Sequence, residues 1–274
     1  RCADVEILPN FFSITFVSLN DYLKVFADCV NEKGKPIPLV QKLSVKEIKE
    51  RLDRVKSDVF YITDKDDSQL ISLLDYFTKM RVIGLNTGNP VNNFTYNGMS
   101  YDDLMIAAFL MQANHFDNSK DLIKYLYNLS KKIIDHQDDK EYIFKDQQIR
   151  TIKHFALPYV GIDVMRIFAL NKVGTIIDKN NEKRYVPKGL KQVSINLQWY
   201  ELLEYEMPPI CDKDKELYWD NPLYKGLPPE KLNKLIDKWD RYILEEYIPD
   251  MCHYNKNDVF IVCEIVRLNP EEIK

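Results

Sequence analysis

The stretch DVEILPNFFSITFV, residues 4–17, predicts the centre of the fold. Two apolar runs, 3–8 and 11–17, lie on either side of Pro9-Asn10, a dipeptide that is typical of turns. We therefore expect an antiparallel hairpin at the start of the chain. Such a hairpin is a natural nucleus for a β-sheet that later elements extend and cover.

The first of these strands carries two acids, Asp4 and Glu6, inside an apolar run. In a strand, residues i and i+2 point to the same face, so the two carboxylates project together. Carboxylates this close repel each other, and one pKa rises unless a cation lies between them. The pair indicates either an edge strand with one solvent-exposed face or an ion-binding site.

The rest of the chain predicts a mixed α/β fold, in which a mixed central sheet is flanked by helices. A capping box at 44–47 begins a helix, and the stretch 58–63 has the composition of a strand. Further strands are predicted at 81–86, at 161–168 and around a hairpin tip at 178–185, with loops or irregular chain at 87–95 and 206–229. Helical patterns are predicted at 67–80, 101–111, 119–134, 139–154, 189–197, 229–247 and 249–268.

The composition is that of an ordinary globular protein, with 274 residues, 45% of them hydrophobic, and a net charge of −4. This length suits one large domain or two small ones, and we expect a single domain over 1–274. The acidic balance argues against a tight, non-specific duplex binder. No apolar window is long enough for a membrane span, no signal peptide is visible, and Arg1 in place of an initiator Met suggests a processed or excised chain. Five scattered cysteines without a CxxC pair indicate reduced thiols and a cytoplasmic protein, in bacteria or a phage-infected host.

Two later segments also present acids at the border of an apolar helix. Asp102 and Asp103 begin the helix predicted at 101–111, where acids commonly compensate the helix dipole. Tyr254 and Asp258 are four residues apart, so they share a face of a helix. Taken alone, each segment is equally compatible with helix capping.

Taken in order, the three segments resemble the motifs of the DEDD family of 3'–5' exonucleases, the DnaQ-like branch of the RNase H-like fold. The Asp-x-Glu motif corresponds to residues 4–6, the Asn-spacer-aromatic-Asp motif to 97–102, and the Tyr-x-x-x-Asp motif to 254–258. The last version is most similar to the proofreading domains of family B and protein-primed phage DNA polymerases. The spacer after Asn97 is one residue longer than in many relatives, and long gaps suggest insertions at about 20–60 and 112–160.

The resemblance implies two Mg²⁺ or Mn²⁺ ions that hydrolyse a phosphodiester bond. Asp4 would bridge both ions, Glu6 and Asp258 would complete the site that activates water, and Asp102 would help to hold the second ion. Four acids and no Cys/His set suit these hard cations.

A water-orienting residue is implied next, and two neighbours compete for the role. Tyr254 matches the tyrosine branch of the family, whereas His253 matches the histidine branch. On one continuous helix Tyr254 lies about 40° from Asp258 and His253 about 140°. The geometry favours Tyr254, provided that the helix begins before Asn255.

Three residues are expected to contact substrate. Asn97 and Tyr101 are candidates for holding the 3' end of a single strand, since an aromatic ring can stack on a base. Lys191 resembles a phosphate-contacting lysine of phage exonuclease domains, although an exposed helix lysine explains it equally well. It ends a basic stretch, 179–191, that is either a phosphate contact or a solvent-exposed hairpin.

The resulting hypothesis is a metal-dependent 3'–5' exonuclease that acts on single-stranded DNA ends in proofreading or in phage or viral DNA replication. Its partners would be the DNA 3' end and a polymerase domain or replication proteins, with no membrane. The alternatives are an exoribonuclease that trims RNA 3' ends and a non-catalytic nucleic-acid-binding module.

Overall fold

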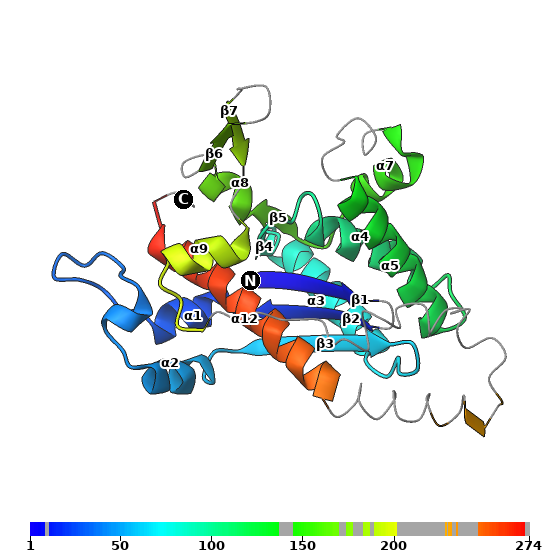
Figure 1. The fold of residues 1–274 in the computed structure, drawn as a ribbon, viewed down its shortest axis with the longest axis horizontal. Coiled ribbons are helices and arrows are strands. Elements are labelled where there is room, and N and C mark those ends of the chain that lie inside the picture. The colour runs from blue at the N-terminus through cyan, green and yellow to red at the C-terminus, as the bar shows by residue number, and fades with distance from the viewer. Residues whose placement is uncertain are drawn as a thin grey trace.

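A computed structural model gives the architecture of the chain (Figure 1). The structure describes residues 1–8, 11–136, 145–169, 174–177, 183–186, 189–201, 228, 230–231, 234 and 246–271.

The core of the molecule is a five-stranded mixed sheet in the order β3-β2-β1-β4-β5. Strands β1, β2 and β3 pair antiparallel, whereas β1, β4 and β5 run parallel to one another. This arrangement confirms the mixed α/β class, the opening hairpin and the strand predicted at 58–63. The strands are β1 (Cys2–Leu8), β2 (Phe11–Val17), β3 (Ser57–Thr63), β4 (Asn92–Thr95) and β5 (Val160–Asp163).

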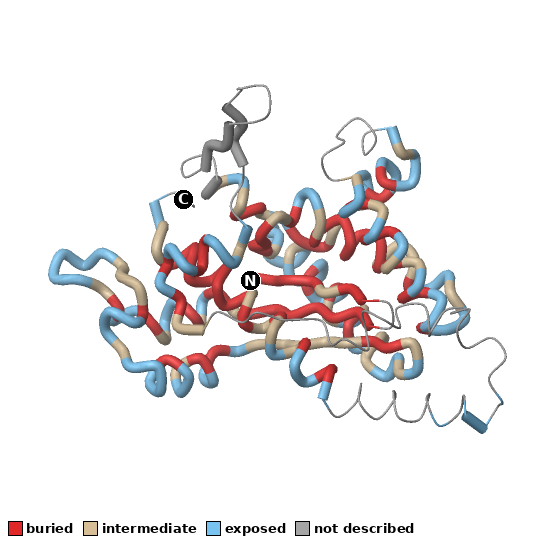
Figure 2. Tube along the Cα trace, viewed as in Figure 1, coloured by how far each residue is buried: buried red, intermediate tan, exposed pale blue. Residues whose placement is uncertain are grey.

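Helices cover both faces of the sheet, so β1 and β2 are buried almost throughout (Figure 2). One face packs against α12 (Ile248–Leu268), and the other against α4 (Asp102–Gln112) and α5 (Ser119–Asp135). The remaining helices are α1 (Leu19–Val25), η1 (Leu39–Gln41), α2 (Val45–Leu52), α3 (Leu70–Thr87), α7 (Gln147–Lys153), α8 (Val164–Ala169) and α9 (Leu190–Asn196). A separate hairpin pairs β6 (Gly174–Ile177) with β7 (Lys183–Val186).

The alternation of β1 divides its side chains between two cores. Ala3, Val5 and Ile7 belong to the core under α4 and α5. Cys2 and Leu8 pack with residues of α12 on the opposite face. Asp4 and Glu6, which share the parity of Cys2 and Leu8, therefore face α12.

The local predictions for the helices are largely confirmed. Ser44 and Glu47 form the reciprocal capping box that begins α2. The helices predicted at 101–111, 119–134, 189–197 and 249–268 correspond to α4, α5, α9 and α12. In the prediction at 139–154, only the part that forms α7 is described. The predictions at 178–182, 206–227 and most of 229–247 lie outside the described residues.

Two predictions between residues 81 and 95 are wrong. The segment 81–86, predicted as a strand, continues α3, which ends at Thr87 before Gly88 in the left-handed region, with φ 68°. The loop predicted at 87–95 contains strand β4. The apolar run misled the prediction because Val82, Ile83 and Leu85 are exposed on a helix rather than buried in a sheet.

A third prediction, the strand at 161–168, is right only in its first part. The chain forms β5 and then turns at Asp163 into α8, and the backbone N–H of Arg166 in this helix donates to Asp163 Oδ1 at 3.3 Å.

None of the described helices combines the length and the apolar character needed to cross a bilayer. The described cysteines, Cys2, Cys29, Cys252 and Cys263, are free thiols.

Candidate metal centre

Three of the predicted acids converge between β1 and α12. One carboxylate oxygen each from Asp4, Glu6 and Asp258 lies within 4.8 Å of the other two. Asp4 is buried, and Glu6 and Asp258 are partly buried. The sheet supplies two of these acids from one strand, and the last helix supplies the third across from them.

Asp102 joins this group from a different direction. It is the first residue of α4 and is 3% exposed. Its charge raises the pKa of Asp4, and the charge of Glu6 raises the pKa of Asp102 in turn. Asp102 therefore interacts electrostatically with Asp4 and Glu6, although among the described residues the three mutually close oxygens do not include one of Asp102.

Asp102 lies near β1 because α4 packs beside this strand. Strands β1 and β4 pair at a single position, Cys2 with Phe94, and β4 ends one residue later at Thr95. Helix α4, whose first residue is Asp102, contacts β1.

Burial and mutual repulsion hold these carboxyls toward their neutral form. Burial raises the pKa of Glu6 to about 8, with a further contribution from the charge of Asp258. Burial likewise raises the pKa of Asp258 to about 7. The pKa values of Asp4 and Asp102 are well above the usual range, first through burial and then through neighbouring carboxylates. A bound cation would reverse both effects, because it favours the ionised form.

The sequence analysis did not identify the polar groups that lie beside the acids. Asn255 is fully buried, and its Nδ2 donates to Asp4 Oδ2 at 2.8 Å. Its Oδ1 has no hydrogen-bond partner among the described residues. The signal was present, since Asn255 lies three residues before Asp258 and therefore shares its helix face.

Two hydroxyls on β2 complete the lining of this region. Thr15 is the cross-strand partner of Asp4, and Ser13 is the partner of Glu6. Both hydroxyl oxygens are buried and lack a hydrogen-bond partner in the described part of the chain. Buried polar groups in this position normally bind water or an ion, so the acids stand among unsatisfied oxygen atoms.

The two candidates for the water-orienting role, Tyr254 and His253, lie in different surroundings on α12. Helix α12 begins at Ile248, so it is continuous through both residues, as the argument for Tyr254 required. A hydrogen bond from Tyr254 lowers the pKa of Asp258 against the larger, raising effect of burial. His253 has a 60% exposed side chain, and its Nε2 lies 3.7 Å from Glu201 Oε2. Tyr254 is thus the residue placed beside the acids.

The segment before α4 is held by an acid that the sequence analysis missed. Asp163, 4% exposed at the end of β5, accepts hydrogen bonds from the backbone N–H groups of Asn97 and Met99, both at 3.2 Å. Asn97 has a φ of 69°, in the left-handed region, and is held there by this contact. Gly98 must be a glycine, since a Cβ there would lie 1.7 Å from Thr95 Oγ1. This loop fixes where α4 begins and hence the position of Asp102.

The three predicted substrate-binding residues lie in different surroundings. Asn97 is half-buried in the loop before α4. The Tyr101 hydroxyl is hydrogen-bonded to Ser130 Oγ at 2.6 Å, while its ring packs at the edge of the core near the acids. Lys191 is exposed on α9, which packs on α12. The role of Lys191 stays a prediction.

Asp103, the neighbour of Asp102, belongs to a structural contact rather than to the acid cluster. Its Oδ1 accepts a hydrogen bond from the hydroxyl of Tyr159 at 2.9 Å. Burial raises the pKa of Asp103 to about 6. Gly161 passes close to this side chain, where a Cβ would lie 2.3 Å from Asp103 Oδ2.

The donor set fits a hard divalent cation. The side chains that meet here offer carboxylate, amide and hydroxyl oxygens, which are the ligands that Mg²⁺ and Mn²⁺ prefer. The thiols and imidazoles that would favour zinc are absent from the described cluster.

Comparisons with protein-family models, with curated proteins and with solved structures find no match for this chain.

Proposed function

We propose that the chain is a metal-dependent 3'–5' exonuclease of the DEDD type, with an RNase H-like fold, that acts on single-stranded DNA ends. The observation that carries this proposal is the convergence of Asp4, Glu6 and Asp258 within 4.8 Å, with Asp102 acting on them electrostatically. These acids come from segments at opposite ends of the chain, and the motif resemblance named each of them.

The fold supports the same conclusion. A hairpin followed by parallel strands places the first motif at the centre of the sheet, and α12 lays the last motif across it. The second motif ends at the first residue of α4. The closeness of acids from segments that are far apart in sequence supports the proposal, because chance matches would have no reason to lie together.

Asp4, Glu6, Asp102 and Asp258 would hold two Mg²⁺ or Mn²⁺ ions. Bound ions of this kind lower the pKa of a water molecule and neutralise charge on the leaving oxygen. The Tyr254 hydroxyl, on the helix face of Asp258, would orient the attacking water. Asn255 holds Asp4 in one orientation by its 2.8 Å hydrogen bond. Asn97 and Tyr101, on the loop that leads to Asp102, would hold the 3' end.

The test is digestion of a 5'-labelled single-stranded DNA with Mg²⁺ or Mn²⁺, beside an RNA of the same sequence. We expect a ladder that shortens from the 3' end and that disappears in chelator. Asp4→Ala should lower the rate by about 10³-fold or more, because each 1.4 kcal/mol of lost stabilisation is a factor of ten. Asp75→Ala, on the exposed surface of α3, is the matched control and should leave the rate unchanged.

The outcomes separate the remaining classes. Faster loss of the RNA would assign the chain to exoribonucleases. No digestion of either strand by a folded protein that binds Mn²⁺ would contradict the enzyme and favour a binding module. Activity in proofreading would show as preferential removal of a mismatched 3' nucleotide from a primed template.

A further inference from the structure

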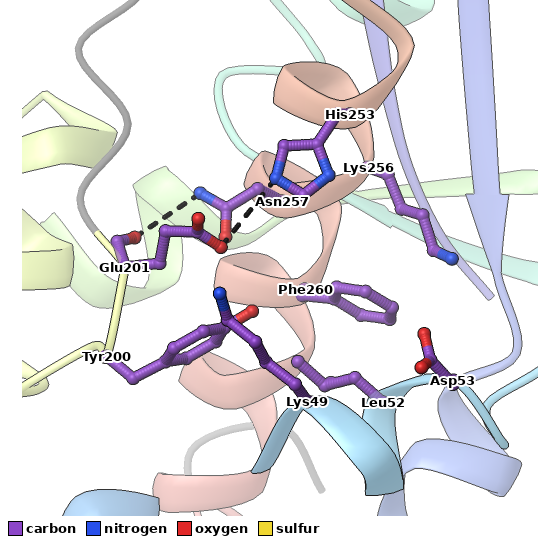
Figure 3. A pocket seen from close by; sticks show the side chains of 9 residues that line it. All are labelled: Lys49, Leu52, Asp53, Tyr200, Glu201, His253, Lys256, Asn257 and Phe260. Carbon is purple, nitrogen blue, oxygen red and sulfur yellow. Dashed lines mark hydrogen bonds and ion pairs between the residues drawn. The ribbon is translucent and has the colours of Figure 1, made fainter. Parts of the chain in front are cut away.

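The face of α12 that points away from the acids lines a second site. A pocket of about 190 Å³ lies between α2, α12 and residues 200–201 (Figure 3). Lys256 and Phe260 line it from α12, and each is two residues from Asp258. Since successive helical residues are about 100° apart, both point about 160° away from Asp258. The pocket is therefore separate from the carboxylate cluster.

The walls combine two aromatic rings with two ammonium groups. Lys256 Nζ lies 5.5 Å from the centre of the Phe260 ring, and Lys49 Nζ lies 6.0 Å from the centre of the Tyr200 ring. The two rings come from different segments and border the same space (Figure 3). Aromatic faces stack on planar heterocycles, and lysine ammonium groups bind phosphate. A ligand that carries both a planar ring and one anion fits this pairing.

A third group in the pocket needs a hydrogen-bond donor. The Oε2 atom of Glu201 is buried and has no hydrogen-bond partner among the described residues. His253 Nε2 lies 3.7 Å from this atom, which is too far for a hydrogen bond. A buried acceptor atom without a partner is unfavourable. A ligand with an N–H group in the plane of its ring would satisfy it.

Size and charge narrow the ligand further. A pocket of about 190 Å³ has room for one planar heterocyclic base, so the sugar and phosphate of a nucleotide would lie at its mouth. The two lysines are opposed by Asp53 and Glu201, so the lining has little net charge. That balance favours a single phosphate over a triphosphate.

We infer that this pocket binds one nucleoside monophosphate unit whose base carries an exocyclic amino group. The base lies against Tyr200 and Phe260, its amino group donates to Glu201, and its phosphate meets Lys49 and Lys256. The inference rests on the proposed function, whose reaction releases nucleoside monophosphates. The same unit can arrive as free product or as a nucleotide within a strand, and the chemistry of the pocket serves both.

The test is calorimetric titration of the full chain with dAMP, dCMP and dTMP in the presence of EDTA. Chelator keeps divalent ions from the acid cluster, so a nucleotide bound there does not contribute. Thymine presents its N–H between two carbonyl oxygens that approach the carboxylate, so dTMP should bind at least about fivefold more weakly than dAMP, in line with 1–3 kcal/mol for a base contact. Deoxyadenosine, which lacks the phosphate, should bind at least about tenfold more weakly than dAMP.

Substitutions of pocket residues test whether the nucleotide binds in this pocket. Glu201→Gln should remove most of the preference for dAMP over dTMP, and Lys49→Met should weaken both nucleotides alike. Lys46→Met is the matched control, because Lys46 lies on the same helix with an 86% exposed side chain and forms an ion pair with Glu50 away from the pocket. It should bind dAMP as the parent protein does.

Titration with a short oligodeoxyadenylate in the same buffer distinguishes binding of a free nucleotide from binding of a nucleotide within a strand. Binding at least about tenfold tighter than that of dAMP assigns the pocket to the strand, and equal binding assigns it to free nucleotide. No heat with either ligand up to about 5 mM, or dAMP binding that survives both Glu201→Gln and Lys49→Met, overturns the inference. Because these titrations need neither metal nor catalysis, a loss of exonuclease activity leaves their result untouched.

Discussion

Helix α12 buries acids in two places, and their surroundings are opposite. Glu264 accepts hydrogen bonds from Arg267 at 2.7 Å on each of its oxygens, and from the Tyr22 hydroxyl at 2.8 Å. Asp258, less than two turns earlier, faces Glu6 and Asp4. The charges that raise the pKa of Asp4 beyond the effect of burial all belong to carboxylates.

The two places differ in whether a side chain of the protein supplies the neutralising cation. At Glu264 the neutralising cation is a side chain, which also donates to the backbone carbonyls of Cys29 and Ile37 and so anchors the segment after α1. At Asp258 the chain brings acids together, and among the described residues no arginine or lysine is a cause of the pKa shifts of the four acids. The first arrangement is complete as folded, whereas the second requires an external cation to be fully ionised at neutral pH.

The largest expected effect comes from breaking the complete arrangement. Arg267→Met leaves Glu264 buried without its partner, which typically costs about 3–5 kcal/mol in the free energy of unfolding. Urea unfolding followed by circular dichroism measures the loss. Arg54→Met, at an exposed position, should change it by no more than about 0.5 kcal/mol. Equal stability of the two variants would mean that the buried ion pair is not structural.

Next in size is the expected effect of the Tyr254 hydroxyl, which we propose orients water. Tyr254→Phe keeps the ring and removes the group beside Asp258, so the exonuclease rate should fall by about 10–100-fold with an unchanged KM. His253→Ala lies on the exposed face and should stay within about twofold of the parent. The reverse pattern, measured by single-turnover digestion, would move the role to the histidine.

A smaller effect is expected on thermal stability when Mg²⁺ is added at different pH values. Without metal, burial raises the pKa of Glu6 from 4.5 to about 8 and that of Asp258 from 3.8 to about 7 in the folded protein. The unfolded chain therefore loses these protons at lower pH, and stability falls as the pH rises from about 4 to about 8. Mg²⁺ binds the ionised form and opposes this loss. We expect Mg²⁺ to raise Tm by about 5 °C at pH 8 and by much less at pH 5.

Thermal unfolding in Mg²⁺ and in EDTA at the two pH values gives this comparison directly. Asp4→Asn, which removes the central ligand, should abolish the Mg²⁺ effect at pH 8. If Mg²⁺ raised Tm equally at both pH values, the stabilisation would not come from these carboxyls.

The smallest expected effect is on the free energy of unfolding, which substitutions of Asp258 and Glu264 on α12 should change in opposite directions. Asp258→Asn removes one of several repelling charges, so in EDTA at pH 8 it should raise the free energy of unfolding by about 1 kcal/mol. Glu264→Gln should lower that free energy, since it weakens the pairing of Arg267. Changes of the same sign would show that the two sites do not differ in the way described.

Local patterns predicted much of this structure. Alternation in the first strand placed Asp4 and Glu6 on one face, and the four-residue spacing of Tyr254 and Asp258 placed them on one side of α12. The capping box at Ser44 was equally local. Each of these features is determined by neighbours within a few residues.

The features that were missed depend on distant partners. Asp163 is recognisable only through its bonds to Asn97 and Met99, which are 66 and 64 residues away. Arg267 reaches Cys29 across 238 residues. The error at 81–86 has the same origin, since whether an apolar segment is a buried strand or an exposed helix depends on what packs against it.

The hydrogen bond between Asn255 and Asp4 joins residues that are 251 positions apart. Contacts of such long range form late in folding, because loop closure must precede them. During synthesis, the acids of β1 leave the ribosome long before α12 exists to face them. The acid cluster is therefore assembled only after α12 has been made, and a product terminated before this helix would lack Asp258 and Asn255.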